Sequence, residues 1–432
     1  MILKQISPVA LATFLAFNPF EGKAQDTASC FPGYMRLEEA LISVSQPYIY
    51  DDKGAIRIGS EVSVQTNGVP YDFSKAFVFP EYIDRDKKDN AYSKLKGDNR
   101  FGALTEWQAQ LIFPVDSASR AQGRHLSVRY RENSAYTGMF GDDAFKLLFD
   151  GNKQFAGQTA DLSGTELYFL AYRSFELGYV LTKPKALYAI HFGLAAGRNL
   201  QQLNIENGSL YTAEDGTYLD LNWNGDFFGS ASRVDGFFNS RASGASLSLE
   251  FKQLAGSKWV FTESLTDLGF MNWNPAGRTV SVDTAFRFTG IQLGNIFDLN
   301  GQTIVLGDTL EQKLLGGNVR ENRMTALPFH LNIGAERMFG GRWSGSGFVD
   351  YRYLPGFQPQ AGLSVRKGFG KQRSIRFMVS YGGFGGLQTG LDAVVFSNHH
   401  HSLNIGTIYN EALLAPKSAG SIGFRLFYVH HI

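Results

Sequence analysis

Residues 375–381 read Ile-Arg-Phe-Met-Val-Ser-Tyr, and residues 422–428 read Ile-Gly-Phe-Arg-Leu-Phe-Tyr. In both stretches a large apolar residue occupies every second position. A period of two is typical of a β-strand, because successive side chains point to opposite faces of the sheet. The alternation therefore predicts that Phe377 lies on one face of a strand and that Arg376 and Ser380 lie on the other.

About six such segments fill the chain from Leu327 to Ile432. Each is about ten residues long, and turns such as Leu354-Pro355-Gly356 and Gly382-Gly383 separate them. Strands of soluble proteins are usually nearer five or six residues. About ten residues tilted by roughly 45° match the hydrocarbon thickness of a bilayer instead. The pattern predicts a transmembrane β-barrel whose apolar side chains face lipid.

The alternation recurs from Ala55 onward and gives about sixteen windows in the whole chain. We therefore expect an all-β fold, an antiparallel transmembrane barrel of about 14–16 strands that spans residues 55–432. The stripes upstream of Leu327 begin at Ile56, Trp107, Leu126, Leu167, Tyr188, Leu219, Leu247, Trp259 and Val280.

Three long connections, near residues 66–100, 134–164 and 293–326, all fall on one side of the predicted barrel. If the first strand starts in the periplasm, that side is extracellular, and the short turns lie opposite, as in bacterial barrels. Asp142–Asp150 and Asp308–Leu315 have helical spacing with acidic first turns. The long extracellular loops are therefore expected to carry short helices.

The N-terminus has the features of a secretory signal peptide over residues 1–24. Lys4 supplies the charge, Ile6–Phe17 form the apolar region, and small residues precede the predicted cleavage after Ala24. Lipidation at Cys30 is the alternative. Residues 25–54 have weak periodicity and are expected either to fill the lumen as a plug or to remain in the periplasm.

The composition excludes some classes of partner and site. The formal net charge is +1, which gives no support for a nucleic-acid partner. Cys30 is the only cysteine, so a disulfide framework or a cysteine metal site within one chain is excluded. The expected surroundings are outer-membrane lipid and, through the loops, another outer-membrane or surface protein.

Three short motifs carry a resemblance to a known family. They are a GN-x-x-F-x-G pattern within Leu148–Gly157, a DLGF-x-x-W pattern within Ser264–Trp273, and Asp98-Asn99-Arg100 before the second predicted strand. In order and spacing they resemble a family of uncharacterised outer-membrane barrels from Bacteroidota, distantly similar to FadL-type barrels and to barrels that serve type IX secretion and gliding. The resemblance implies a barrel in the outer membrane and no particular activity.

No sequence motif predicts a catalytic, cofactor or metal site. The chain has no nucleophile elbow, His-Glu-x-x-His pair or phosphate loop. The three adjacent histidines of 399–401 cannot all face one ion, so a solvated periplasmic turn is the preferred interpretation. Lumen-facing candidates come from separated strands, with no pairing expected at neighbouring registers: His125, His191, His330, Asp283 and Asp350.

Charges of both signs occur at predicted lumen positions. Glu106 is expected opposite Arg129 or Arg131, and Arg425 on the last strand is expected to meet Glu61 on the first. Such charges either brace the barrel or line a selective pore. The candidate lumen charges are Glu61, Glu106, Arg129, Arg131, Arg366, Arg376 and Arg425.

The leading functional hypothesis is a non-enzymatic outer-membrane barrel, a scaffold or accessory of secretion or surface machinery that acts through its extracellular loops. The second is a transport barrel for a hydrophobic or small ligand, and the third is a membrane-embedded hydrolase or acyltransferase. The candidate partner-binding loop residues are Leu148, Asn152, Phe155, Asp308 and Asn318.

Overall fold

The structure, a computed structural model, describes most of the chain from the first barrel strand to the C-terminus. The described residues are 42–43, 46–47, 54–78, 81–183, 185–230, 239–256, 258–273, 277–289, 322–339, 342–369, 373–397 and 401–432. The predicted signal peptide, Cys30 and most of the 25–54 segment lie outside them. Of that segment, β1 (Ile42–Ser43) and β2 (Gln46–Pro47) pair with each other.

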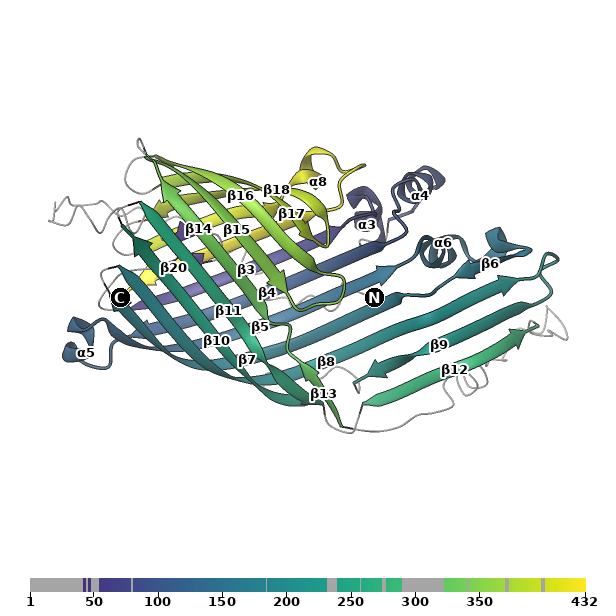
Figure 1. The fold of residues 1–432 in the computed structure, drawn as a ribbon, viewed down its shortest axis with the longest axis horizontal. Coiled ribbons are helices and arrows are strands. Elements are labelled where there is room, and N and C mark those ends of the chain that lie inside the picture. Colours follow the sequence, from purple (N-terminus) through teal and green to yellow (C-terminus); the bar gives the residue numbers. More distant parts are fainter. Residues whose placement is uncertain are drawn as a thin grey trace.

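Fourteen antiparallel strands form a closed barrel, within the range predicted from the sequence (Figure 1). The last strand pairs with the first from Ile422 opposite Val64 to His431 opposite Ala55, which closes the ring. The strands are β3 (Ala55–Thr66), β4 (Asn99–Phe113), β5 (Arg124–Phe140), β7 (Thr165–Lys183), β8 (Ala186–Thr212), β10 (Ala242–Ala255), β11 (Trp259–Trp273), β14 (His330–Met338), β15 (Trp343–Arg352), β16 (Gln358–Phe369), β17 (Arg373–Gly383), β18 (Gly386–Ser397), β19 (His401–Tyr409) and β20 (Ile422–His431).

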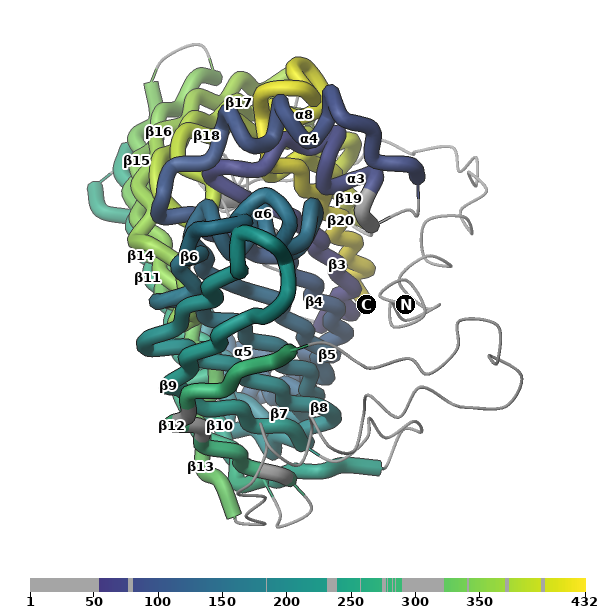
Figure 2. Tube along the Cα trace, turned by 90° about the vertical axis from the view of Figure 1, so that its right-hand side faces the viewer, coloured from purple at the N-terminus to yellow at the C-terminus, as the bar shows by residue number. Residues whose placement is uncertain are grey.

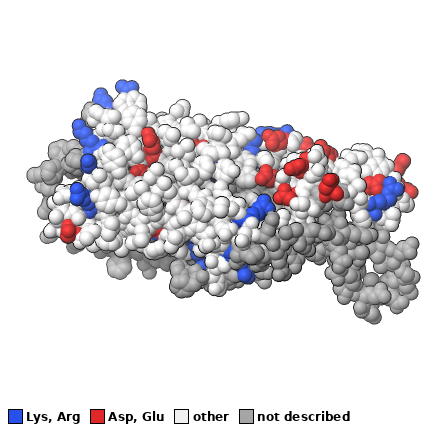
Figure 3. All heavy atoms as spheres, turned by 60° about the horizontal axis from the view of Figure 1, so that its bottom comes forward, with Lys and Arg blue, Asp and Glu red and all other residues white. Residues whose placement is uncertain are grey.

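The predicted alternation of faces is present in the barrel wall. Phe377 is 49% exposed on the outer face of β17, whereas its neighbour Arg376 is 6% exposed and points inward. Leu363 on β16 is 71% exposed. Figure 3 shows the middle of one outer face with few charged atoms, as expected of a surface that contacts lipid.

Two of the predicted windows are strands outside the ring. β9 (Leu219–Gly229) pairs with residues 201–212 of β8, and β12 (Arg278–Phe288) pairs with β9. β8 is 27 residues long, so its second half, with these two strands, extends past the barrel (Figure 1). These strands alternate like barrel strands, and only their pairing distinguishes them. Two shorter strands complete the sheet: β6 (Gln158–Asp161) pairs with β8, and β13 (Arg323–Ala326) pairs with β11.

Several short helices gather at one end of the barrel, where they lie across part of its opening (Figure 2). We call this group the cap: α3 (Tyr71–Val78), α4 (Arg85–Tyr92), α6 (Asp142–Asp150), the 3-10 turn η2 (Asn152–Phe155) and α8 (Glu411–Leu414). The bounds of α6 confirm the helix predicted from the sequence. The other predicted helix, Asp308–Leu315, lies outside the described residues.

The first barrel strand begins, and the last one ends, at the end of the barrel away from the cap. Ile432 donates a backbone hydrogen bond to the carbonyl of Gly54 at 3.0 Å, and the short helix α5 (Ser117–Ala121) lies at this same end (Figure 1). Within the part of the chain that the structure describes, no helix is long and apolar enough to cross a membrane.

Candidate functional site

The lumen of the barrel contains a buried network of ion pairs. Arg129 on β5 donates to Glu176 on β7 at 2.6 Å and to Glu250 on β10 at 2.8 Å. Arg131 also donates to Glu176, at 2.9 Å, and forms a short contact with Asp267 on β11. All five side chains are under 10% exposed. Four strands are therefore joined across the lumen rather than only to their neighbours.

A second group of ion pairs lines the strands on the opposite wall. Arg366 on β16 donates to Glu336 on β14 at 2.5 Å. Asp392 on β18 accepts from Arg376 on β17 at 2.5 Å and also contacts Arg425 on β20. These side chains too are under 10% exposed, so their charges are removed from water and depend on each other.

The formal charges of sixteen side chains in and around these ion pairs balance. Eight cations face eight anions, so the sum is zero. The cations are Arg57, Arg129, Arg131, Lys252, Arg352, Arg366, Arg376 and Arg425, and the anions are Glu61, Glu106, Glu176, Glu250, Asp267, Glu336, Asp350 and Asp392. A pore that selects by charge presents rings of one sign, so this arrangement favours bracing of the wall.

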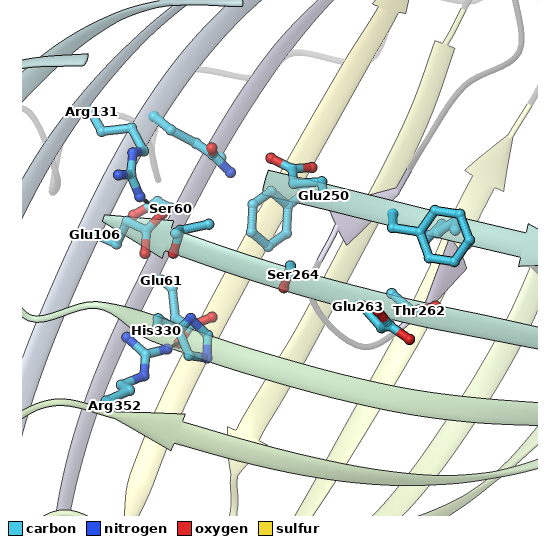
Figure 4. Close-up of a pocket in the computed structure, with 16 residues that line it drawn as sticks. Ser60, Glu61, Glu106, Arg131, Glu250, Thr262, Glu263, Ser264, His330 and Arg352 are labelled. Atoms are coloured by element: carbon cyan, nitrogen blue, oxygen red, sulfur yellow. Dashed lines mark hydrogen bonds and ion pairs between the residues drawn. The ribbon is translucent and has the colours of Figure 1, made fainter. Parts of the chain in front are cut away.

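Two small cavities remain between the ion pairs. Their volumes are about 50 and 40 Å³, which is room for a few water molecules each. Figure 4 shows the larger cavity, with Glu61, His330 and Arg352 together on one side and Glu106 and Arg131 on another. Charged and polar side chains of the described strands therefore line both cavities.

Toward the cap, the lumen is filled by an apolar layer that we call the stopper. The turn that follows β15 brings Leu354 and Phe357 across the lumen, and Gly356 at its tip, with φ of 78°, approaches Met139 and Arg100 on strands β5 and β4. Phe384, from the turn between β17 and β18, is fully buried against Gly102, where a Cβ atom would lie only 2.2 Å from its ring. The stopper packs with wall residues Leu104, Ala135, Tyr168, Leu170 and Tyr172.

The predicted lumen charges meet partners that the sequence did not all identify. Arg425 lies opposite Glu61 in register, as predicted, but its ion pair is with Asp392. Glu61 instead pairs with Arg352 at 3.4 Å. Glu106 lies 3.9 Å from Arg131, which was one of its two predicted partners.

The expectation that no lumen histidine pairs at a neighbouring register was wrong. His330 on β14 lies 2.5 Å from Asp350 on the adjacent strand β15, because the pair is diagonal to the register in which Asn332 faces Asp350. His191 lies 3.1 Å from the buried hydroxyl of Ser127. Asp283, by contrast, is an exposed residue of β12, outside the lumen.

The candidate loop residues differ in exposure. Leu148 on α6 is 72% exposed, whereas Phe155 at the end of η2 is only 7% exposed and packs into the cap region. Phe155 is thus a packing residue, and Asn152 begins the η2 turn that holds it. Asp308 and Asn318 lie outside the described residues. Within those residues, no group of three or more His, Cys, Asp or Glu side chains could hold a metal ion.

The cap is a folded unit with its own small core. Phe73 of α3 and Phe145 of α6 are buried, and their ring centroids lie 5.3 Å apart. Asp150 at the end of α6 accepts hydrogen bonds from Lys88 and from Tyr92 of α4, each at 2.6 Å. Burial raises the pKa of Tyr92, so its phenol stays protonated and donates. These contacts fix the three helices relative to one another.

Residues 46–396 match the family of unknown function DUF5723, and the chain belongs to this family. No curated protein sequence matches the chain.

The fold is similar to solved bacterial barrels at low sequence identity. The toluene transporter TodX of P. putida gives a TM-score of 0.41 at 10% identity, over 88% of this chain and 91% of that chain. The toluene transporter TbuX of Ralstonia pickettii gives 0.42 at 8%, over 88% and 90%. The translocator domain of the autotransporter NalP from Neisseria meningitidis gives 0.36 at 8%, over 92% and 95%.

Proposed function

We propose that this protein is an outer-membrane β-barrel that acts as a scaffold or accessory for another exported or surface protein, which it binds through its extracellular cap. The observation that carries the proposal is the pair of layers inside the lumen, a network of ion pairs of both signs and an apolar stopper between that network and the cap. A barrel filled in this way is suited to holding a surface rigid rather than to conducting solutes.

The cap supplies the proposed contact surface. Its helices α3, α4 and α6 are joined by a buried core, and the Lys88–Asp150 ion pair, whose nitrogen–oxygen distance is 2.6 Å, also joins α4 to α6. Three large side chains of this region are exposed to solvent at 72% (Leu148), 82% (Leu414) and 85% (Tyr82). Exposed apolar side chains on a rigid support are typical of protein-binding surfaces.

A pull-down experiment tests the surface. Leu148→Glu should abolish recovery of the partner from membranes, because it places a charge in the contact. Val115→Glu is the matched control, since Val115 is 64% exposed on the turn at the opposite end of the barrel. If both variants recover the same proteins as the unaltered chain, the cap is not the contact surface.

Conductance measurements test the rest of the proposal. The purified protein should give no stable large-conductance channels in planar bilayers, because the lumen cavities hold only a few waters. Stable channels would replace the scaffold function with the second candidate, a transport barrel. The two cavities, which lie in the lumen beside Glu61 and Arg131, are the observation that favours this alternative.

A further inference from the structure

Two histidines and a tyrosine converge on the outer face of the barrel wall, at the end away from the cap. His401 on β19 and His430 on β20 lie directly opposite each other in the register of these neighbouring strands. Their Nδ1 atoms are 3.3 Å apart, and the hydroxyl of Tyr428 lies 2.7 Å from Nδ1 of His401. All three side chains are part-buried.

The distance between the two nitrogens matches that between two ligands of one metal ion. Zinc binds histidine nitrogens at about 2.0–2.1 Å in tetrahedral geometry, which places neighbouring ligand atoms about 3.3–3.4 Å apart. The same separation is slightly longer than the range of about 2.7–3.2 Å that is usual for N–H···O hydrogen bonds. The two rings are tilted by only 28°, with centroids 5.0 Å apart.

The residues paired with this site on neighbouring strands are apolar. Leu403 lies opposite Tyr428 across the same strand pair, and Ile56 and Ile58 on β3 lie opposite His430 and Tyr428. These neighbours are apolar and do not compete as ligands. His431 alternates with His430 along β20, so it belongs to the other face of the strand.

We propose that His401 and His430 bind a divalent transition metal ion of the zinc or copper class, with Tyr428 at the edge of the site. Imidazole nitrogens suit these ions, and water completes the coordination. Because β20 also pairs with β3, a metal ion here joins the last two strands of the sheet beside the seam that closes the barrel.

Zinc titration of the purified, tag-free protein tests the site, with binding followed by calorimetry. His401→Ala and His430→Ala should each weaken zinc binding by at least about tenfold. His431→Ala is the matched control, because it removes the adjacent histidine from the other face, and it should leave the affinity unchanged. Electrophoresis without heating verifies that each variant is a folded barrel.

A second titration separates this site from the two histidines that precede His401 in the sequence. A His399→Ala/His400→Ala variant should retain zinc binding, since the proposed ligands lie on the strands. The proposal is overturned if this variant loses binding while His430→Ala retains it, or if His431→Ala and His430→Ala weaken binding equally. As a further readout, zinc should raise the unfolding temperature of the unaltered protein and not that of His430→Ala.

Discussion

Asp392 lies between two arginines, Arg376 and Arg425, and none of the three side chains is more than 7% exposed. Asp392→Asn would leave two buried guanidinium groups without the carboxylate that compensates their charge. Breaking a buried pair in this way costs about 3–5 kcal/mol. We therefore expect a loss of that size in the free energy of unfolding, measured by urea titration of the protein in lipid vesicles.

An exposed ion pair supplies the comparison for Asp392. Arg287 on β12 and Asp220 on β9 form two hydrogen bonds, at 2.6 and 2.7 Å, outside the ring of barrel strands. Their side chains are 58% and 33% exposed. Asp220→Asn should lower the free energy of unfolding much less than Asp392→Asn, because solvent screens the exposed pair. Equal losses for the two variants would show that the lumen pair is as well solvated as the exposed pair.

Phe377 tests the orientation of a single residue against lipid. Its side chain is 49% exposed near the middle of β17, on the apolar outer face. Phe377→Arg should cost about 2–4 kcal/mol, as expected for an arginine on a lipid face near the bilayer midplane. Urea titration in vesicles measures this cost, with Phe377→Leu as the conservative control. A neutral result for the arginine variant would place this surface outside the hydrocarbon.

Individual elements show how far the sequence alone could lead. Alternation with a period of two predicted the strands, and helical spacing predicted α6. Both patterns are properties of the local sequence. Alternation did not distinguish β9 and β12 from barrel strands, since they alternate in the same way and differ only in pairing with the second half of β8. That pairing depends on strand register, which the sequence did not determine.

The same limit applies to side-chain pairs. His330 and Asp350 lie 20 residues apart, and they meet only because β14 and β15 pair in a register that sets them on a diagonal. His401 and His430 become opposed for the same reason. The sequence also did not predict that the turn with Leu354 and Phe357 packs into the lumen, because the residues of a turn do not show the direction in which it packs.

The cap is the element in which pH should act first. Burial alone would raise the pKa of Asp150, but hydrogen bonds from Lys88 and Tyr92 and the charge of Lys88 hold that pKa below its ordinary value. A carboxylate with a depressed folded-state pKa contributes stability above its unfolded pKa, and that contribution is lost as the pH falls through the folded value. Acid should therefore loosen α4 from α6 below about pH 4.

Hydrogen exchange of α4 and α6 measures this loosening. Protection of both helices should fall between roughly pH 5 and pH 2, while protection of the barrel strands persists. Asp150→Asn lacks the titrating carboxylate, so its cap should be less protected at pH 5 and should change less on acidification. A cap that responds to acid equally in both proteins would assign the pH dependence to other groups.

On the scale of the whole molecule, the stopper and the ion-pair network lie one behind the other along the lumen. A solute that enters from the cap end meets the stopper before it reaches the cavity beside Glu61 and Arg131. The wall is closed by hydrogen-bonded strands around the full ring. Entry from the cap end therefore depends on movement of the turns that carry Phe357 and Phe384, rather than on movement of the strands.

Thiol labelling of intact cells tests this dependence together with the orientation of the barrel. Cys30 is the only cysteine, so a Cys30→Ser background leaves one introduced thiol, Ser264→Cys, in the lining of the larger cavity. An impermeant reagent should label this thiol slowly. Phe357→Ala/Phe384→Ala should increase the rate at least about tenfold, which corresponds to about 1.4 kcal/mol in the opening free energy. Asp89→Cys, on the exposed cap, is the control and should react rapidly with and without the stopper substitutions. If those substitutions leave the labelling rate of Ser264→Cys unchanged while Asp89→Cys reacts, the stopper does not control access.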